Sequence, residues 1–376
     1  MVEIKEIPDS KSDLKKFVKF PIDNIYAGNQ FYVPALILDE IDTLRRDKNP
    51  AFEFCESIYF MAFRNGEPVG RIAGIINHKV NDRSDVNSVR FGFIDFIDDA
   101  EVVDALMDAV IKWGKSKGAQ QIVGPLGFTD MDNEGMLTDG FDQLSTMATI
   151  YNHPYYNDHM VRMGFEKDAE WVEFKIMVPD GIPEKHKRIS DIISTKYEVR
   201  NIHFSSKKQL VARYGKQLFE LINHAYDSLY GYSPLSPKQI EHYIKMYIPI
   251  VRLRDLSLIV DKNDELIGLG LAMPSISKAL IATRGRLFPF GWIKLLKALK
   301  QRNEIVDLLL VAVRPDYQGK GVNSLLFTDL IPKFIENGYK MAETNPELFT
   351  NQKVQSQWQY FDTTLHKRRC SYKKNI

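Results

Sequence analysis

The chain repeats one pattern of elements, and this duplication limits the folds open to it more than any other feature. Ile58–Asn77 reads as an apolar stretch, an Asn-Gly turn and a second apolar stretch. Asn-Gly is the typical centre of a two-residue hairpin. Leu256–Pro274 repeats this order with an Asn-Asp turn, and the letters EPVG at 67–70 return as ELIG at 265–268. The sequence therefore predicts two hairpins of one design.

The segments after the two hairpins also correspond. In the first half an apolar strand at 90–97 precedes a helical pattern that ends at Gly118, and QQIVGP resumes as a strand. In the second half the strand is Val306–Val313, the helix is Val322–Glu336, and YKMAETNP takes the place of QQIVGP. We expect an α/β protein with two tandem domains, each a mostly antiparallel twisted sheet flanked by helices.

The length agrees with two domains, because 376 residues exceed the usual size of a single core. We predict one domain at 1–180, a linker with a short helix at 181–196 and a second domain at 197–376. The second copy carries an extra amphipathic segment at 284–303, between its hairpin and its central strand.

Bulk composition is that of a soluble globular protein, with 44% hydrophobic and 26% charged residues. A net charge of +1 gives no support for nucleic acid as a partner. The two cysteines, Cys55 and Cys370, are expected to be reduced thiols. No apolar run is long enough to span a membrane and the N-terminus lacks a signal-peptide core, so the expected compartment is the cytoplasm.

The stretch Gln318–Asn323, QGKGVN, carries the clearest chemical signal. It links an unbroken apolar strand to the start of a helix, where backbone N–H groups lack internal partners. Gly319 and Gly321 allow the backbone to approach a ligand closely, and Lys320 adds a positive charge. A glycine turn of this kind can bind a phosphate, or it can be a turn and nothing more.

VAVRPDYQGKGVNSLLF resembles the acetyl-CoA motif of the GNAT superfamily of N-acetyltransferases, where a strand ending V-x-P precedes Q/R-x-x-G-x-G/A. Val313, Pro315, Gln318 and Gly321 match, and Leu325 and Leu326 follow on the inner face of the helix. The order of elements in both halves is also that of this fold. The resemblance covers nearly the whole chain as a tandem pair, but the cofactor motif occurs only in the second copy, and Asp98, Asp99 and Glu101 at the first copy's helix start would repel a pyrophosphate.

The resemblance implies acetyl-CoA, or another acyl-CoA, as the acyl donor. Asn323 departs from the motif, which has a small residue there; its amide could reach a phosphate oxygen, or it could face solvent. The cofactor-binding residues that the resemblance implies are Val311, Val313, Gln318, Gly319, Lys320, Gly321, Val322, Asn323 and Asn351.

Two residues are candidates for the chemistry. Asp307 stands eleven residues before Gln318, the spacing of the general base in the histone-modifying branch of the family. The alternative is a strand-end aspartate that faces solvent or caps a neighbour. Trp358 stands where the family often has a tyrosine as general acid, and Tyr360 is the nearest tyrosine, although two residues correspond to about 200° around a helix.

Three further stretches bear on the acceptor. Glu343, Asn345 and Glu347 would suit a cationic amine, or they form a helix start with favourable acids. The long segment 127–156 could shape a substrate pocket or serve in packing. The segment 284–303 could lie on a membrane or cover an acyl chain, or pack its apolar stripe on its own domain. No metal site is expected.

The sequence therefore predicts an acyl-CoA-dependent N-acyltransferase, with acetyl as the expected acyl group, that acts on a primary amine of a small molecule or peptide. A sensor that keeps the fold and binds CoA without turnover is the alternative. An aminoacyl transferase of the tandem, peptidoglycan-building kind is a third reading, which the net charge of +1 disfavours. The acceptor and the oligomeric state, a homodimer included, stay open.

Overall fold

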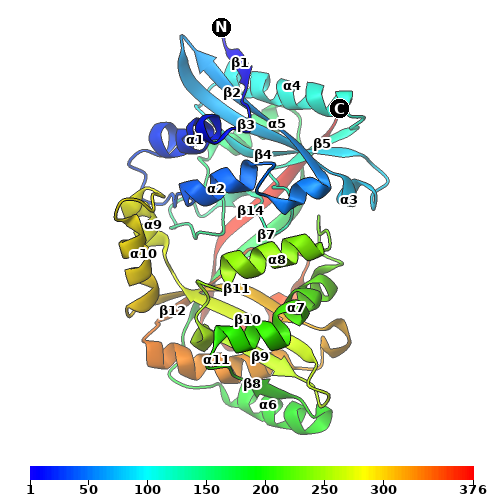
Figure 1. Cartoon of the computed structure of the whole chain (residues 1–376), viewed down its shortest axis with the longest axis vertical. Helices are drawn as coiled ribbons and strands as arrows, with labels where there is room; N and C mark the ends of the chain where they lie inside the picture. Colours follow the sequence, from blue (N-terminus) through cyan, green and yellow to red (C-terminus); the bar gives the residue numbers. More distant parts are fainter. The chain divides into compact units, whose positions relative to one another are not determined.

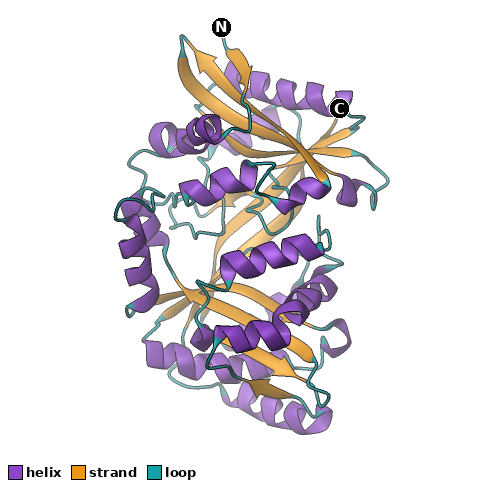
Figure 2. Cartoon of the chain, in the orientation of Figure 1, coloured by secondary structure: helices purple, strands orange, loops and turns teal.

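The computed structural model describes residues 1–376, which form two compact units that interleave in the sequence (Figure 1). Unit 1 contains Met1–Val172, Ile276–Leu296 and His366–Ile376. Unit 2 contains Glu173–Ser275 and Lys297–Leu365. Helices and strands are distributed along the whole chain (Figure 2). None of the helices combines the length and the hydropathy that crossing a bilayer requires.

Unit 1 is a sheet in the order β1-β2-β3-β4-β5-β14-β7, in which only β4 and β5 run parallel among the neighbours whose register is known. Its elements are β1 (Glu3–Glu6), α1 (Lys11–Phe20), a π-helix (Pro21–Ile25), α2 (Ile37–Leu44), a 3-10 helix (Pro50–Glu53), β2 (Cys55–Arg64), β3 (Glu67–Asn77), α3 (His78–Asn81), β4 (Ser88–Phe96), α4 (Ala100–Ser116), β5 (Gln121–Gly124), β6 (Met136–Asp139), α5 (Tyr155–Arg162), the first part of β7 (Glu166–Met177), α9 (Ser277–Thr283), the start of α10 (Gly291–Lys300) and most of β14 (Thr363–Asn375).

Two apolar clusters form the core of unit 1. Helix α4 buries Val102, Val103, Leu106 and Val110 on strands β3 and β4, because these positions recur every three to four residues. Helices α1 and α2 bury a second set against β2 and β3, with Leu14 and Phe17 fully buried. Unit 1 is therefore a packed domain in its own right.

Unit 2 repeats the design, with the strand order β7-β12-β11-β10-β9-β8. Strands β11 and β12 run parallel, and the other neighbours with known register are antiparallel. Its elements are the rest of β7, α6 (Glu184–Tyr197), β8 (Arg200–Ile202), α7 (Lys207–Tyr226), α8 (Pro237–Tyr247), a 3-10 helix (Leu253–Asp255), β9 (Leu256–Val260), β10 (Leu266–Pro274), the end of α10, β11 (Ile305–Val313), a 3-10 helix (Pro315–Tyr317), α11 (Asn323–Asn337), β12 (Met341–Thr344), β13 (Glu347–Leu348), α12 (Gln352–Gln355) and a 3-10 helix (Ser356–Tyr360).

Both predicted hairpins are confirmed. Strands β2 and β3 pair around Asn65 and Gly66, whose φ angles of 54° and 84° are those of a two-residue hairpin turn. Strands β9 and β10 pair around a turn in which Asp264 has φ 65°. A capping box is present at Ser236, since Ser236 and Gln239 exchange side-chain and backbone hydrogen bonds.

The units differ from a simple division of the chain into halves. The last strand, β14, pairs with β5 through Tyr372–Asn375, so the C-terminal residues belong to unit 1. Residues 276–296, which include the first part of the extra segment at 284–303, also belong to unit 1. The continuous domains 1–180 and 197–376 remain a prediction from the repeat, and the predicted linker at 181–196 carries helix α6 of unit 2.

Candidate active site

Strands β11 and β12 of unit 2 pair over a short length and then separate. Their parallel register joins Ile305–Leu308 to Met341–Thr344 and ends there, although β11 continues to Val313. On its other side β11 pairs with β10 along its whole length, with one extra residue, Leu309, at a bulge. The second half of β11 therefore has an open edge.

The carbonyl groups on this open edge are already bound by side chains of unit 2. Asn345 Nδ2 donates to Leu309 O at 2.8 Å, and Tyr226 Oη donates to Val311 O at 3.0 Å. Gln318 Nε2 donates to Val313 O at 2.9 Å, so this predicted cofactor residue braces the strand end.

The N–H groups of Val311 and Val313 point to the same edge as those carbonyls. Arg314 N donates to Ile267 O on β10, and successive residues of a strand direct their backbone groups to opposite edges. Val311 is also 38% exposed, which is high for the central strand of a unit. The edge thus offers two amide donors in the spacing that an extended ligand with amide carbonyls can use.

The glycine turn lies at the end of this edge and has the backbone that the sequence predicts. Gly319 and Gly321 have φ angles of 72° and 82°, which favour glycine. No side chain caps the N-terminus of α11, and the helix dipole there favours an anion, while Ser324 N and Leu325 N donate within the turn to Gly321 O and Val322 O. Lys320 Nζ lies over the rings of Tyr197 and Tyr317, at 5.1 and 5.3 Å.

Asn323, the departure from the family motif, is held by a neighbour. Its Nδ2 donates to Gln357 Oε1 at 3.3 Å, so the amide is directed to the 3-10 helix Ser356–Tyr360. The preceding residue, Val322, is 1% exposed and packs in the core with Leu325 and Leu326. Asn323 therefore ties the helix start to the segment that carries Trp358.

Asp307 is buried on the face of the unit 2 sheet opposite α11. Its neighbour Val306 packs with Leu330 and Phe334 of α11, and alternate residues of a strand point to opposite faces. Asp307 is 1% exposed and in register with Glu343 of β12, which is in register with Lys175 of β7. This places the predicted base among buried charged side chains and excludes the alternative of an aspartate in solvent.

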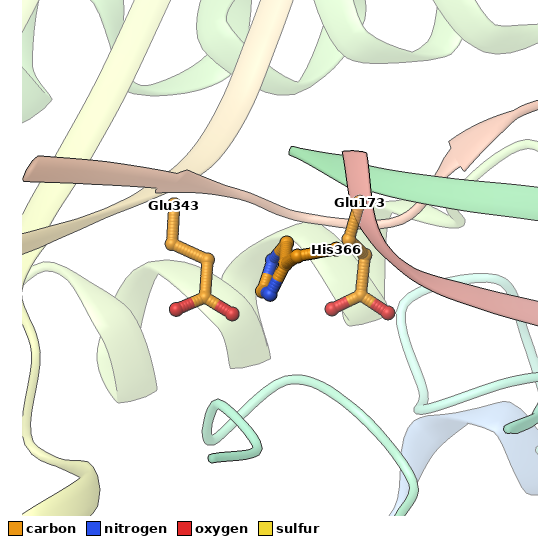
Figure 3. A group of neighbouring side chains, drawn as sticks. All are labelled: Glu173, Glu343 and His366. Atoms are coloured by element: carbon orange, nitrogen blue, oxygen red, sulfur yellow. The ribbon is translucent and has the colours of Figure 1, made fainter. Parts of the chain in front are cut away.

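Three side chains of the kinds that bind metal ions lie close together, and the sequence does not predict this group. Glu173, Glu343 and His366 each offer a ligand atom within 4.8 Å of the others, and Figure 3 shows the two carboxyl groups on either side of the imidazole. Because the three residues come from distant strands, no spacing in the sequence could have revealed them.

Glu347 is a titratable residue of unit 2 whose pKa is strongly shifted. Burial raises the pKa of its carboxyl group from 4.5 to about 7, against the opposing effect of the Trp358 indole. Trp358 Nε1 donates to both carboxyl oxygens, at 2.9 and 3.2 Å. Trp358 thus holds Glu347 in place, and Glu347 follows Asn345, the residue that braces the open edge, by two positions.

The remaining predicted residues have local partners. The Tyr360 hydroxyl is hydrogen-bonded to Lys185 and to Gln359, and its ring packs against His186 of α6. Asn351 caps α12 by accepting from Val354 N. Their roles in catalysis and cofactor binding remain predictions.

Solved structures match this architecture over its full length. A tandem GNAT protein from the clavulanic acid biosynthesis pathway superposes with a TM-score of 0.57 at 10% identity, covering 100% of this chain and 98% of that one. A protein of unknown function from Enterococcus faecalis, described as a probable N-acyltransferase, has a TM-score of 0.51 at 8% identity and covers 100% and 73%. The chain has the tandem GNAT fold.

Curated relatives are more similar in sequence than these structures. Protein YghO of Escherichia coli is 27% identical over 98% of this chain and 94% of the relative. A bacterial ceramide synthase of Caulobacter vibrioides is 25% identical over 82% of this chain and 79% of the relative. No protein-family model matches the chain.

In the first GNAT unit the corresponding strand edge is closed. Ile97 N donates to Val69 O as Arg314 N does to Ile267 O, so Phe96 of β4 corresponds to Val313. Tyr156 Oη accepts from Phe96 N at 3.1 Å, and Tyr155 Oη donates to Phe96 O at 2.6 Å. Helix α5 therefore occupies the edge that is open in the second GNAT unit.

The first GNAT unit also lacks an anion site at its helix start. Asp99 caps α4 by accepting from Val102 N, and Arg64 pairs with Asp99 and Glu101. Arg90 occupies the position in unit 1 that Asp307 has in unit 2. Arg90 pairs with the residue five positions after Gly70, and Asp307 pairs with the residue five positions after Gly268. This agrees with the sequence, which has the cofactor motif in the second copy alone.

Proposed function

We propose that the protein is an acyl-CoA-dependent N-acyltransferase whose second GNAT unit binds the donor and acylates a primary amine. The observation that carries this proposal is the open edge of β11, with the N–H groups of Val311 and Val313 directed to it and the glycine turn at its end. The amide carbonyls of a pantetheine arm fit the two donors. The pyrophosphate of CoA fits the uncapped start of α11 beside Lys320.

Glu347 is the proposed general base for the acceptor. An ammonium group must lose a proton before its nitrogen can attack the thioester carbonyl, and a carboxylate with a pKa of about 7 can accept that proton at neutral pH. The new C–N bond then forms as the C–S bond breaks; the nitrogen gives up its second proton, and the departing thiolate takes up one proton and leaves as CoA. Asp307 is the second candidate for the base, since it is buried in the same unit.

The relatives suggest which acceptors and donors should be tested. A ceramide is a long-chain amino alcohol acylated on nitrogen, and a protein named bacterial ceramide synthase matches 82% of this chain. We therefore include a long-chain amine among the acceptors and palmitoyl-CoA beside acetyl-CoA among the donors.

The test is calorimetric titration of the full chain with acetyl-CoA and palmitoyl-CoA, beside two glycine variants. Gly319→Asp puts a carboxylate in the turn, at φ 72° and with no atom within 4 Å of the new Cβ. Gly28→Asp in unit 1 has the same backbone strain, at φ 81° and in equally open space, and serves as the matched control.

We expect one donor site per chain, with affinity at least tenfold weaker in Gly319→Asp and unchanged in Gly28→Asp. Release of CoA in the presence of an amine then separates an enzyme from a sensor that binds CoA without turnover. If neither donor binds to the wild type, the proposal is wrong.

A further inference from the structure

The segment between β10 and β11 is rich in basic residues. Residues 275–303 contain seven lysines and arginines and no aspartate or glutamate. Arg284 pairs with Asp23 of unit 1, whereas Arg286, Lys294, Lys297 and Lys300 are exposed. A positive surface of this kind attracts an anionic partner.

Large apolar side chains lie exposed among these cations. Phe288 and Phe290 are 70% and 71% exposed, and Trp292, Ile293 and Leu296 are each more than 40% exposed. The sequence left open whether the apolar stripe packs on the protein. In the structure Leu295 is buried, while Ile293 and Leu296 face outward. Large side chains are seldom exposed as a group unless they meet a partner.

The exposed aromatic turn is an ordered part of unit 1. Trp292 N donates to Leu287 O at 2.8 Å, and Trp292 Nε1 donates to Pro289 O at 3.2 Å. At Gly291 any Cβ would lie 1.7 Å from Arg286 O, so the turn depends on glycine there. Gly285 O accepts from Ile37 N of α2, which fixes the base of the segment. The backbone thus presents Phe288 and Phe290 in a defined turn.

Helix α10 continues this surface. At 100° per residue Trp292, Leu296 and Ile293 lie within about 100° of one another around the helix. Lys300 falls between Leu296 and Ile293, one turn further along, and Lys297 and Lys294 follow beyond Ile293. A helix that lies in a membrane interface has a typical pattern of side chains. Its aromatic residues lie at the level of the lipid headgroups, its aliphatic residues reach the acyl chains, and its lysines lie near the headgroup phosphates.

We propose that the segment Arg286–Lys300, labelled α10 in Figure 1 with the turn before it, binds the surface of an anionic lipid bilayer. Its phenylalanines, Trp292 and Leu296 enter the acyl boundary, and its lysines meet the headgroup phosphates. The aliphatic residues favour a bilayer over nucleic acid, because Ile293 and Leu296 offer no stacking face or base contact. Membrane binding by this surface is a separate proposal from the acyltransferase activity and does not depend on it.

The test is co-sedimentation of the full chain with vesicles of phosphatidylcholine and with equimolar phosphatidylcholine–phosphatidylglycerol vesicles, without donor or amine. We expect binding to the anionic vesicles, at least tenfold weaker in Phe288→Ser/Phe290→Ser/Trp292→Ser, because apolar area is lost. Lys294→Gln/Lys297→Gln/Lys300→Gln should weaken it about fivefold per lysine. The control Val161→Ser/Ile335→Ser removes apolar side chains that are 66% and 38% exposed on other helices, and should bind as the wild type does.

Circular dichroism establishes that each variant is folded before its binding is compared. Equal binding by the wild type and the apolar variant would overturn the proposal, as would no binding to anionic vesicles. A dimer in size-exclusion chromatography that the apolar variant converts to a monomer, without vesicle binding, would assign the surface to a second copy instead. None of these outcomes bears on donor binding, so the test is separate from that of the proposed function.

Discussion

The ends of β4 in unit 1 and β11 in unit 2 share one backbone arrangement and present opposite surfaces. Both strands follow a hairpin, both are joined to it by equivalent hydrogen bonds, and both lead to a helix. In unit 1 the tyrosines of α5 bind the backbone of Phe96, while in unit 2 the N–H of Val313 points to an open edge. The fold alone therefore does not create a donor site; the groups that occupy one strand edge determine it.

The segments that follow β12 in unit 2 and β5 in unit 1 also differ in the chemical groups that they carry. Thr344–Glu347 of unit 2 ends in a carboxyl group with a pKa of about 7. Gly124–Gly127 of unit 1 contains no titratable side chain, and its Leu126 N donates to Phe91 O. If unit 2 alone performs the chemistry, changes at its edge should alter binding and turnover, and matched changes in unit 1 should alter stability.

The largest effect is expected from Glu347→Gln. Loss of the proposed general base should lower kcat by about a hundredfold or more. In the wild type kcat/KM should fall as the pH drops below about 7, because Glu347 is then protonated, and this acid limb should be absent in the variant. Asp307→Asn is the companion variant: if it alone removes the limb, Asp307 is the base.

Glu347→Gln should also change the free energy of unfolding, in a direction that the raised pKa determines. The folded-state pKa of Glu347 is raised, so the native protein binds more protons than the unfolded chain between pH 4.5 and about 7, and stability falls as the pH rises through that window. Glu347→Gln should therefore raise the free energy of unfolding by roughly 1–3 kcal/mol at pH 8 and change it little at pH 4. Urea denaturation at the two pH values measures this difference.

A smaller effect is expected from removing one backbone donor. Val313→Pro deletes the N–H that faces the open edge and leaves the ladder to β10 intact, so donor affinity should fall about tenfold. Phe96→Pro is the matched change in unit 1. It should lower thermal stability, since Tyr156 loses its donor, and leave donor affinity unchanged in calorimetry. Weaker donor binding in Phe96→Pro would contradict the division of roles.

The smallest effect is expected from a change in the pKa of the Glu347 carboxyl group. Trp358→Phe removes the indole N–H that lowers the carboxyl pKa, so the acid limb of kcat/KM should move to higher pH by about one unit. A shift to lower pH, or none, would mean that the limb belongs to another group.

Local patterns made much of the fold predictable. The Asn65–Gly66 turn, the capping box at Ser236 and the apolar periodicity of α4 and α11 each act over a few residues, so the sequence shows them directly. The glycine turn was found for the same reason, since positive φ angles at Gly319 and Gly321 require a particular residue type.

Features that depend on distant residues could not be read in this way. The family motif makes Trp358 the replacement of a tyrosine acid, whereas the hydrogen bonds of Trp358 to Glu347 show a supporting contact across a turn. The closure of β4 by Tyr156 joins residues 60 positions apart. Nothing in the residues around Phe96 indicates which side chain will reach that edge, because long-range packing decides it.

The position of β14 has a consequence for synthesis of the protein. Residues His366–Ile376 belong to unit 1, where β14 lies between β5 and β7 in the sheet. A ribosome that has made the first 172 residues has therefore not yet supplied a central strand of that unit. Unit 1 can reach its final form only after residues His366–Ile376 have been translated. Unit 1 therefore begins to be synthesised before unit 2 but cannot finish folding before most of unit 2 has been made.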